Sequence, residues 1–583
     1  MDTKADEREY PRPPSSSIHP ASCPAPTIEL LVEIADIDKE LAWHYLQIAL
    51  LKARRNALAP IRRLPNELMI RIFTIVAVES DTLFDLRWTK LMYVCHHWHS
   101  LALAAKPLWA FIDVRWRRLG RLFGQLRHSG AAPLSFRMTC HEHSSDLFLD
   151  TILEQSVRIR DFELDGQARQ VYGLIGRLTE YKFPILSSLS LSPSSGRDEL
   201  QEDAIRDLPE AILDGGLPSL RELTLTSIGF PWTSLSGLTA LALDNCHDSS
   251  PTLPRSFHGL LAMLSSCPQL QNLKLEVTIP APLPDQLYAT VELPALARLY
   301  LRDLVVACEI LLLHLRISPT AAIQILPYTV QTGADVRGLL VPIRRHLRAI
   351  GARTPRMLQI TRSDAAYCTI TVCDYTVLPT RFEYEADCPL SLNSHPDTEN
   401  NVRQILTKVL KAIPSESITH LNGRGCFDVR PVTWRATILL LPALDTIYLG
   451  LSTDSTGAVN CIGALHDIET LDPQHEKFPR VRCLHIRIGR RQNINTDAIA
   501  AMLNALEGLI QKCCANGTSL QALVFDDESY NLTKQEPVLE RFYPMVGEIR
   551  WNEEVYDPVR RREELAQWEA ERRALMVELG IEE

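Results

Sequence analysis

The sequence predicts an α/β protein in which short strands alternate with helices in a solenoid, preceded by a helical N-terminal part. A phrase of the form P-x-L-x-x-L-x-L recurs from about residue 184 onward, and helical patterns precede several of its copies. Repeats of about 20–40 residues that each hold a strand and a helix are typical of a leucine-rich-repeat solenoid. Before the repeats, apolar residues recur at heptad and helical spacings, which indicates helices alone.

Composition narrows the class of protein. The chain has 583 residues, of which 46% are apolar and 23% charged, and a net charge of -10, which is ordinary for a globular protein and argues against a nucleic-acid binder. No charged start leads into an apolar core, so we expect no signal peptide. The longest apolar run, residues 304–317, contains Glu309 and His314 and is too short to span a bilayer.

The cysteines indicate the compartment. Fourteen cysteines are scattered without CxxC pairs, which predicts buried thiols in a reducing environment. We therefore expect an intracellular protein, cytoplasmic or nuclear, with neither a membrane nor a nucleic acid as partner.

The first 59 residues predict a tail and a long helix. Residues 1–27 are rich in proline, serine and charge, and should be disordered because they cannot bury enough apolar surface. Residues 28–59 carry about four heptads, ended by Pro60, with His44 and Arg55 at the two imperfect seam positions. The helix either associates with a second copy or packs on its own protein. The apolar seam consists of Leu30, Ile34, Ile37, Leu41, Ile48, Leu51 and Leu58.

Residues 60–114 predict two short amphipathic helices. The first follows Leu64-Pro65 and places Leu68, Ile72, Phe73 and Val76 on one face at helical spacing. The second carries an apolar stripe three to four residues apart, made of Leu91, Val94, Cys95, Trp98 and Leu101.

A cluster of metal-ligand residue types lies within this stripe. Cys95 is followed by His96, His97 and His99, and the nearest further ligands are Cys140, His141 and His143, without a recurring metal spacing. The periodicity places Cys95 in a packed interface, so we predict a small buried hydrophobe and no metal site. A metal hydrolase built on Cys95 and Cys140 is the weakest of three hypotheses.

The two helical segments together resemble a known family. "LPNELMIRIF" followed by "LMYVCHHWHSLALAAKPLW" is similar to the F-box pattern LPxELLxxIF, then VCxxWxxL and a final LW. The usual acidic turn between the helices is replaced by "ESDTLFDLRW", residues 79–88. A heptad helix before the motif and leucine-rich repeats after it resemble the layout of many fungal F-box proteins. The matching positions are Leu64, Pro65, Glu67, Leu68, Ile72, Phe73, Val94, Cys95, Trp98, Leu101, Leu108 and Trp109.

The resemblance implies a three-helix F-box module that docks on a Skp-type adaptor and, through it, on a cullin. A domain this small cannot bury its whole apolar face, so either a partner or the region that follows must cover it. The residues implied in adaptor binding are Leu64, Pro65, Leu68, Ile72, Phe73, Val94, Cys95, Trp98 and Leu101.

Residues 115–545 predict an irregular leucine-rich-repeat domain. In "PSLRELTLT", Leu223 and Leu225 should point into the core, and Arg221, Glu222 and Thr224 should face a target on the concave side. The register is poor between 305 and 440, where we expect insertions, and "NGRG" (422–425) is interpreted as a turn. Residues 546–583 predict an exposed amphipathic helix or tail. Eight strands are expected within residues 184–192, 218–226, 235–245, 268–276, 294–302, 442–450, 479–487 and 517–527.

No catalytic motif or cofactor fingerprint occurs in a suitable context, so we expect a protein that is not an enzyme and binds no cofactor. The first functional hypothesis is the substrate receptor of a cullin–RING ubiquitin ligase, which holds an unknown target with its repeats. The second is a non-catalytic leucine-rich scaffold with a degenerate F-box and no role in a ligase.

Overall fold

The computed structural model describes most of the chain, but the predicted disordered tail, residues 1–27, lies outside the described residues. The described residues are 28–114, 119–140, 146–194, 207–209, 212, 217–232, 235–248, 256–282, 286–327, 336–349, 351–362, 368–376, 388–394, 399–426, 429–451, 456–471, 479–488, 496–527, 536–552 and 554–578.

The chain divides into two compact units. The first comprises Met1–Phe111 and Gly124–Gly130, and the second comprises Ile112–Phe123 and Ala131–Glu583. Helix α4 (Leu119–Ser129) is shared between the two units. The sequence placed the boundary at residues 114 and 115, close to the first of these divisions.

The first unit is helical. The heptad residues form the single helix α1, which ends three residues before Pro60 because proline cannot extend the helical hydrogen bonding. Two further α-helices alternate with short 3-10 helices. The elements are α1 (Ile28–Ala57), η1 (Pro60–Arg63), α2 (Asn66–Glu79), η2 (Arg87–Tyr93), α3 (His96–Ala104) and η3 (Lys106–Ala110).

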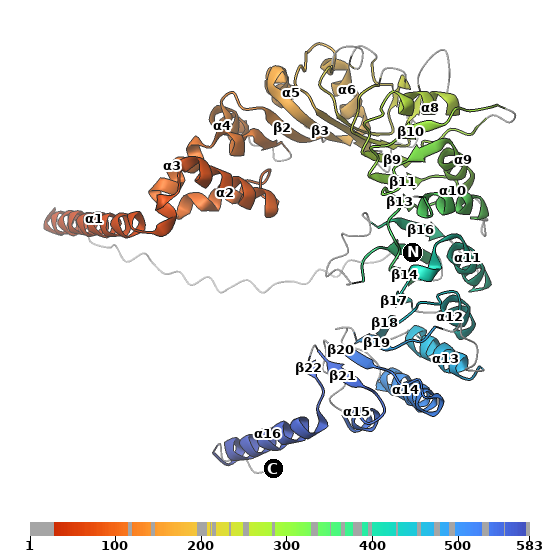
Figure 1. The fold of residues 1–583 in the computed structure, drawn as a ribbon. Helices are drawn as coiled ribbons and strands as arrows, with labels where there is room; N and C mark the ends of the chain where they lie inside the picture. Colours follow the sequence, from red (N-terminus) through yellow and green to blue (C-terminus); the bar gives the residue numbers. More distant parts are fainter. Residues whose placement is uncertain are drawn as a thin grey trace, which may run out of the picture. The chain divides into compact units, whose positions relative to one another are not determined.

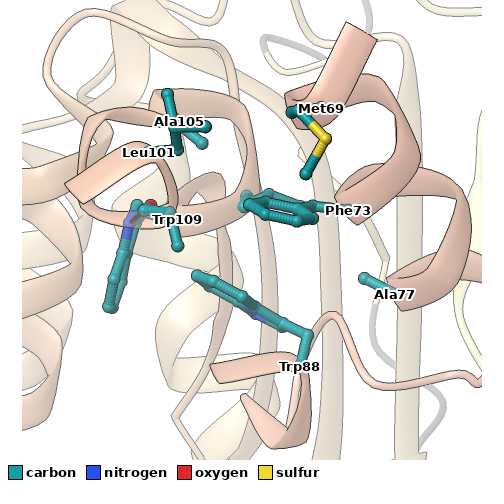
Figure 2. Close-up of a cluster of buried hydrophobic side chains, with 9 residues drawn as sticks. Met69, Phe73, Ala77, Trp88, Leu101, Ala105 and Trp109 are labelled. Atoms are coloured by element: carbon teal, nitrogen blue, oxygen red, sulfur yellow. Dashed lines mark hydrogen bonds between the residues drawn. The ribbon is translucent and has the colours of Figure 1, made fainter. Parts of the chain in front are cut away.

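The core of the first unit forms where α2, η2 and α3 meet (Figure 2). Helix α2 contributes Met69, Phe73 and Ala77, which lie on one face at a spacing of four residues. Trp88 of η2 packs edge-on against Trp109 with 5.0 Å between ring centroids. The sequence placed Leu68, Ile72, Phe73 and Val76 on one face of this helix. Of these, Phe73 lies in the core, Ile72 is half-buried, and Leu68 and Val76 are exposed.

The second unit is built on one 18-stranded sheet. From β2 onward, neighbouring strands are parallel except in the β14–β15, β15–β16 and β21–β22 pairs. In spatial order the strands are β1 (Phe111–Asp113), β2 (Leu134–Cys140), β3 (Ile159–Gln167), β4 (Ser188–Ser194), β5 (Glu222–Thr226), β7 (Ala240–Asp244), β9 (Asn272–Glu276), β11 (Arg298–Arg302), β13 (Ala322–Ile325), β16 (Leu390–Ser394), β15 (Cys368–Cys373), β14 (Met357–Arg362), β17 (His420–Cys426), β18 (Thr446–Leu451), β19 (Cys483–Ile488), β20 (Ala522–Asp527), β21 (Glu548–Trp551) and β22 (Glu554–Val555).

Helices α8 to α14 lie along one face of this sheet (Figure 1). Two short parallel pairs, β6 (Gly229–Phe230) with β8 (His247–Asp248) and β10 (Val291–Leu293) with β12 (Leu315–Ile317), lie in the connections. The helices are α5 (Asp146–Leu153), α6 (Ala168–Leu178), α8 (Phe257–Ser265), α9 (Val305–His314), α10 (Arg337–Leu347), α11 (Glu399–Ala412), α12 (Pro431–Ile438), α13 (Gly457–Glu469), α14 (Thr496–Asn516), α15 (Glu536–Phe542) and α16 (Pro558–Glu578), with short 3-10 helices η4 (Ser156–Arg158) and η7 (Ser415–Ser417).

The eight strands that the repeated phrase predicts are all present, as β4, β5, β7, β9, β11, β18, β19 and β20. Leu223 and Leu225 are buried, whereas Glu222 is exposed and Thr224 half-buried. Alternation with a period of two therefore turns the leucines toward the helices and the intervening residues toward the opposite face. The second unit is thus a mixed α/β structure with a long parallel sheet, as predicted.

The region between residues 305 and 440 holds the expected irregularity. Strand β15 is antiparallel to both β14 and β16, so the spatial order of these three strands is the reverse of their order in the chain. The prediction of a turn at residues 422–425 is wrong, because these residues belong to β17. Gly423 occupies the inward position that Leu449 takes in β18, and an added Cβ there would lie 2.5 Å from the ring of buried Trp434. Trp434 fills the volume that a leucine takes elsewhere.

The C-terminal part differs from the predicted tail in where it begins. Strands β21 and β22 extend the sheet past residue 545, and helix α16 follows only at Pro558. No helix among the described residues is both long and apolar enough to cross a membrane. The described cysteines form no disulfide, and most of them are buried.

Candidate functional site

Helix α2 carries a second apolar face that its own unit leaves exposed. Leu68 and Ile75 are each 45% exposed and Val76 is 42% exposed, on the helix face next to the one that carries the buried Met69, Phe73 and Ala77. Exposed apolar patches on a soluble protein commonly mark interaction sites. We call the set formed by Leu64, Leu68, Ile72, Ile75 and Val76 the α2 surface.

The residues predicted for adaptor binding divide into two groups. Leu64, Pro65, Leu68 and Val94 are exposed, and Ile72 is half-buried. Phe73 and Leu101 instead belong to the buried core, so these two residues support the module rather than offering contact surface.

The predicted stripe on the second helix is not continuous. Helix α3 begins only at His96, and Val94 precedes it with 56% of its surface exposed. Trp98 is half-buried and packs on Phe73 with 5.0 Å between ring centroids. Cys95 is half-buried at the N-cap position of α3, so the prediction that it is a buried hydrophobe is wrong. The chain leaves the helical path before α3, which the periodicity of the apolar residues does not reveal.

The candidate metal ligands do not converge in the described part of the chain. Cys140 is buried at the end of β2, where burial and the nearby Asp165 raise the pKa of its thiol to about 11. His141 and His143 lie outside the described residues. Among those described, no three His, Cys, Asp or Glu side chains are placed to hold a metal ion.

The second unit carries a continuous row of outward residues across its sheet. We call the sheet face opposite the leucines the open face; in Figure 1 it is the face that α8 to α14 do not cover. One residue of each strand from β2 to β21 lies in register along it, and four of these, Ser391, Thr371, Asn422 and Val524, are buried. In order, the row consists of Arg137, Glu163, Ser190, Thr224, Ala242, Lys274, Tyr300, Gln324, Ser391, Thr371, Gln359, Asn422, Tyr448, His485, Val524 and Arg550.

The open face begins with paired side chains between β2 and β3. Arg137 donates to Glu163 at 2.8 Å and Thr139 donates to Asp165 at 2.8 Å. Ser135 donates to Asp161 one step earlier along the same pair of strands. These carboxylates already have partners on the neighbouring strand.

A second charged group lies on β7, β9 and β11. Glu276 is almost fully buried and accepts from Lys274 at 2.6 Å and from Arg302 at 3.2 Å. Burial, followed by the adjacent Glu276, raises the pKa of Asp244. Burial likewise raises the pKa of Tyr300, over whose ring the Lys274 ammonium lies at 5.2 Å. The group is balanced in charge, so it favours a polar partner over a strongly charged one.

The rings of the open face gather on β17, β18 and β19. His420, Tyr448 and His485 follow one another across these strands, with centroid distances of 6.0 Å and 4.7 Å. The guanidinium of Arg424 lies 5.4 Å from the Tyr448 ring and donates to Asp526 at 2.8 Å. Stacked rings next to a fixed guanidinium form a rigid surface with little side-chain entropy to lose on binding.

Burial also determines the charge of this ring cluster. It lowers the pKa values of His420 and His485; for His485 the nearby Arg424 and Arg550 act in the same direction, while Asp526 opposes them. Both imidazoles are therefore held more strongly in the neutral form than they would be in an unfolded chain.

The outward positions were predicted in part. Glu222 and Thr224 lie on the open face, as expected. Arg221 was predicted to alternate with the inward leucines of this strand. It instead precedes β5, and its guanidinium donates to the carbonyl of Gly237 at 3.0 Å. Tyr448 and His485 were missed, although they occupy the same position in "TIYLG" and "CLHIR" as Thr224 does in "ELTLT". Aligning the repeats on their leucines would have found them.

The likeness of this chain to known proteins is slight. No family model matches the sequence, and no curated protein matches it. Among solved structures, the leucine-rich repeat-containing protein LegL7 of Legionella pneumophila matches 58% of this chain and 86% of its own length. The identity is 12% and the TM-score 0.23.

Proposed function

We propose that the chain is the substrate-recognition subunit of a Skp–cullin–F-box ubiquitin ligase, acting inside the cell without catalytic groups of its own. In this proposal, residues 60–114 form an F-box that docks on the Skp-type adaptor and thereby on the cullin. The second unit is an irregular leucine-rich-repeat solenoid that binds the target. Catalysis follows from holding the target close to the ligase.

The observation that carries the proposal is that α2 has two apolar faces, of which only one packs in the core. Met69, Phe73 and Ala77 hold the core, so the module is packed without using Leu68 or Ile75. An apolar face that the fold does not need is expected to be covered by another protein, and a helix packed against it would bury it well. The sequence that forms this face is the one that resembles the F-box motif.

The open face supports the second half of the proposal. Its outward side chains differ in kind from strand to strand, while the inward leucines repeat. A surface that varies over a constant scaffold is suited to selecting one partner, because exposed side chains can change without cost to the core.

Co-purification of the full-length chain with a recombinant Skp-type adaptor tests the docking step. We expect the wild-type chain to form a stable complex and the Leu68→Asp chain to lose it, because a carboxylate would lie in the centre of the apolar contact. The double change Leu64→Ala and Pro65→Ala should also abolish capture while the repeats stay folded.

Val78→Asp is the matched control. Val78 is 57% exposed and lies on the same helix, outside the α2 surface. Around the helix axis, Met69 borders one side of that surface and Val78 the other. Complex formation should survive this change. If the folded wild-type chain does not bind the adaptor, or if Leu68→Asp binds as well as wild type, the docking proposal fails and the scaffold hypothesis takes its place.

A further inference from the structure

Helix α1 leaves the described part of its heptad seam uncovered. Its described side chains, from Val32 to Ala57, are exposed except for Gln47 and Asn56, which are half-buried. Ile37 is 51% exposed although it lies in the middle of the seam. A 30-residue helix with an apolar stripe that the described residues leave unpacked needs a partner to be stable in water.

The charges along α1 point to the identity and direction of that partner. Its first half carries Glu29, Glu33, Asp36, Asp38 and Glu40 against Lys39 alone, and its last two turns carry Lys52, Arg54 and Arg55 without an acidic residue. Two copies laid antiparallel bring each acidic half beside a basic half. A parallel pair would bring like charges together.

The imperfect seam positions favour the same direction. In a parallel pair, Arg55 would face Arg55 and His44 would face His44 in single layers of the seam. In an antiparallel pair, His44 lies opposite Leu41 of the second copy, and Arg55 approaches the acidic half. The remaining layers then pair aliphatic side chains, Ile37 with Ile48 and Ile34 with Leu51.

We infer that α1 is the dimerisation element of this protein, a two-stranded antiparallel coiled coil between two copies of the chain. The inference goes beyond the proposed function and does not rest on it. Dimerisation would join two copies of both units, so one assembly would present two open faces and two α2 surfaces.

Sedimentation of the full-length chain tests dimerisation. We expect a dimer for the wild type, and at least about 100-fold weaker association for Ile37→Asp, because each dimer would bury two carboxylates in the seam. The matched control is Leu46→Asp, which alters an apolar residue of similar exposure on the outer side of the same helix. It should leave the dimer intact.

Directional disulfide trapping tests the orientation. Ile37→Cys chains mixed with Ile48→Cys chains should form a 37–48 cross-link, identified by mass spectrometry, whereas neither variant alone should cross-link to itself at the new cysteine. Ala53→Cys, on the outer side of the helix, is the control. A 37–37 cross-link would mean a parallel pair. A monomeric wild type, or equal loss of association in Ile37→Asp and Leu46→Asp, would overturn the inference and leave α1 to a different partner.

Discussion

Two runs of parallel strands in the second unit share one backbone plan and differ in how they fill their cores. In the run from β4 to β11, every paired inward position is a leucine, and residues in the left-handed conformation follow β5, β7 and β9. In the run from β17 to β20, helices α12, α13 and α14 connect the strands. There the inward positions also hold isoleucine, phenylalanine and, in β17, glycine.

The comparison shows that the side chains of a helix and those of the strand beneath it fill the same space between the two layers. Where α12 inserts the fully buried Trp434, β17 can offer only Gly423 at the facing position. Interiors are packed to nearly constant density, so a large side chain in one layer requires a small one in the other. A repeat that looks degenerate in its strand is therefore compensated by its helix.

Leu225→Ala should produce the largest change in stability, because Leu225 has no exposed surface in the leucine-rich run. We expect a loss of about 2–5 kcal/mol in the free energy of unfolding, from lost burial and a residual cavity. Urea unfolding measures it. Glu222→Ala, a change at an outward position of the same strand, should alter the free energy of unfolding by no more than about 0.5 kcal/mol. Equal losses at both positions would contradict a one-sided strand.

Gly423→Ala should destabilise the second run by about 1–3 kcal/mol, since the new methyl would overlap the Trp434 ring. The same change at Gly463, within helix α13, meets no atom within 4 Å and should stabilise by up to about 1 kcal/mol. Urea unfolding of the two variants should therefore give shifts of opposite sign. A neutral Gly423→Ala would mean that Trp434 is free to move.

Much of the fold could be predicted because leucine spacing reports burial directly. The eight repeat strands follow from it, but β17 does not, since Gly423 is understandable only once Trp434 is seen beside it. Helix α2 shows a different limit. Both of its faces are apolar, and periodicity cannot tell which of Leu68 and Met69 is covered by the rest of the module.

The candidate sites were less predictable than the fold for a related reason. The ring cluster of Tyr448 and His485 lies at outward positions, where the fold sets the direction of a side chain but not its type. The charge pairs between β2 and β3 depend on a register that no repeated phrase indicates. Predicting the side-chain contacts on the open face thus requires the strand pairing, whereas predicting the core requires only the spacing of apolar residues.

Val277→Asn should stabilise the leucine-rich run by about 1 kcal/mol. Val277 has a φ of 46°, a left-handed conformation that costs a β-branched residue strain but that asparagine tolerates. Asn245 holds the equivalent position after β7 with a φ of 51°. The reverse change Asn245→Val should lose at least as much, because the Asn245 amide also donates to Ser227. Thermal unfolding of both variants measures these changes. If these positions simply preferred apolar residues, Val277→Asn would destabilise the protein and Asn245→Val would stabilise it.

The smallest expected effect is a pH dependence of the second run through His485. The folded-state pKa of His485 lies below its ordinary value of 6.5, chiefly because of burial, so the unfolded chain binds the proton more readily. The contribution of neutral His485 to stability is therefore complete above the unfolded pKa and is lost as the pH falls toward the folded pKa.

His485→Gln tests this sign. Urea unfolding at about pH 7.5 and about pH 5 should show a smaller loss on acidification for His485→Gln than for the wild type, since glutamine does not titrate. The loss should be modest because the ring is partly solvated on the open face. His258→Gln, an exposed position on α8, is the matched control and should behave as the wild type does. A larger loss in His485→Gln than in the wild type would mean that the protonated ring, paired with Asp526, is the stabilising form.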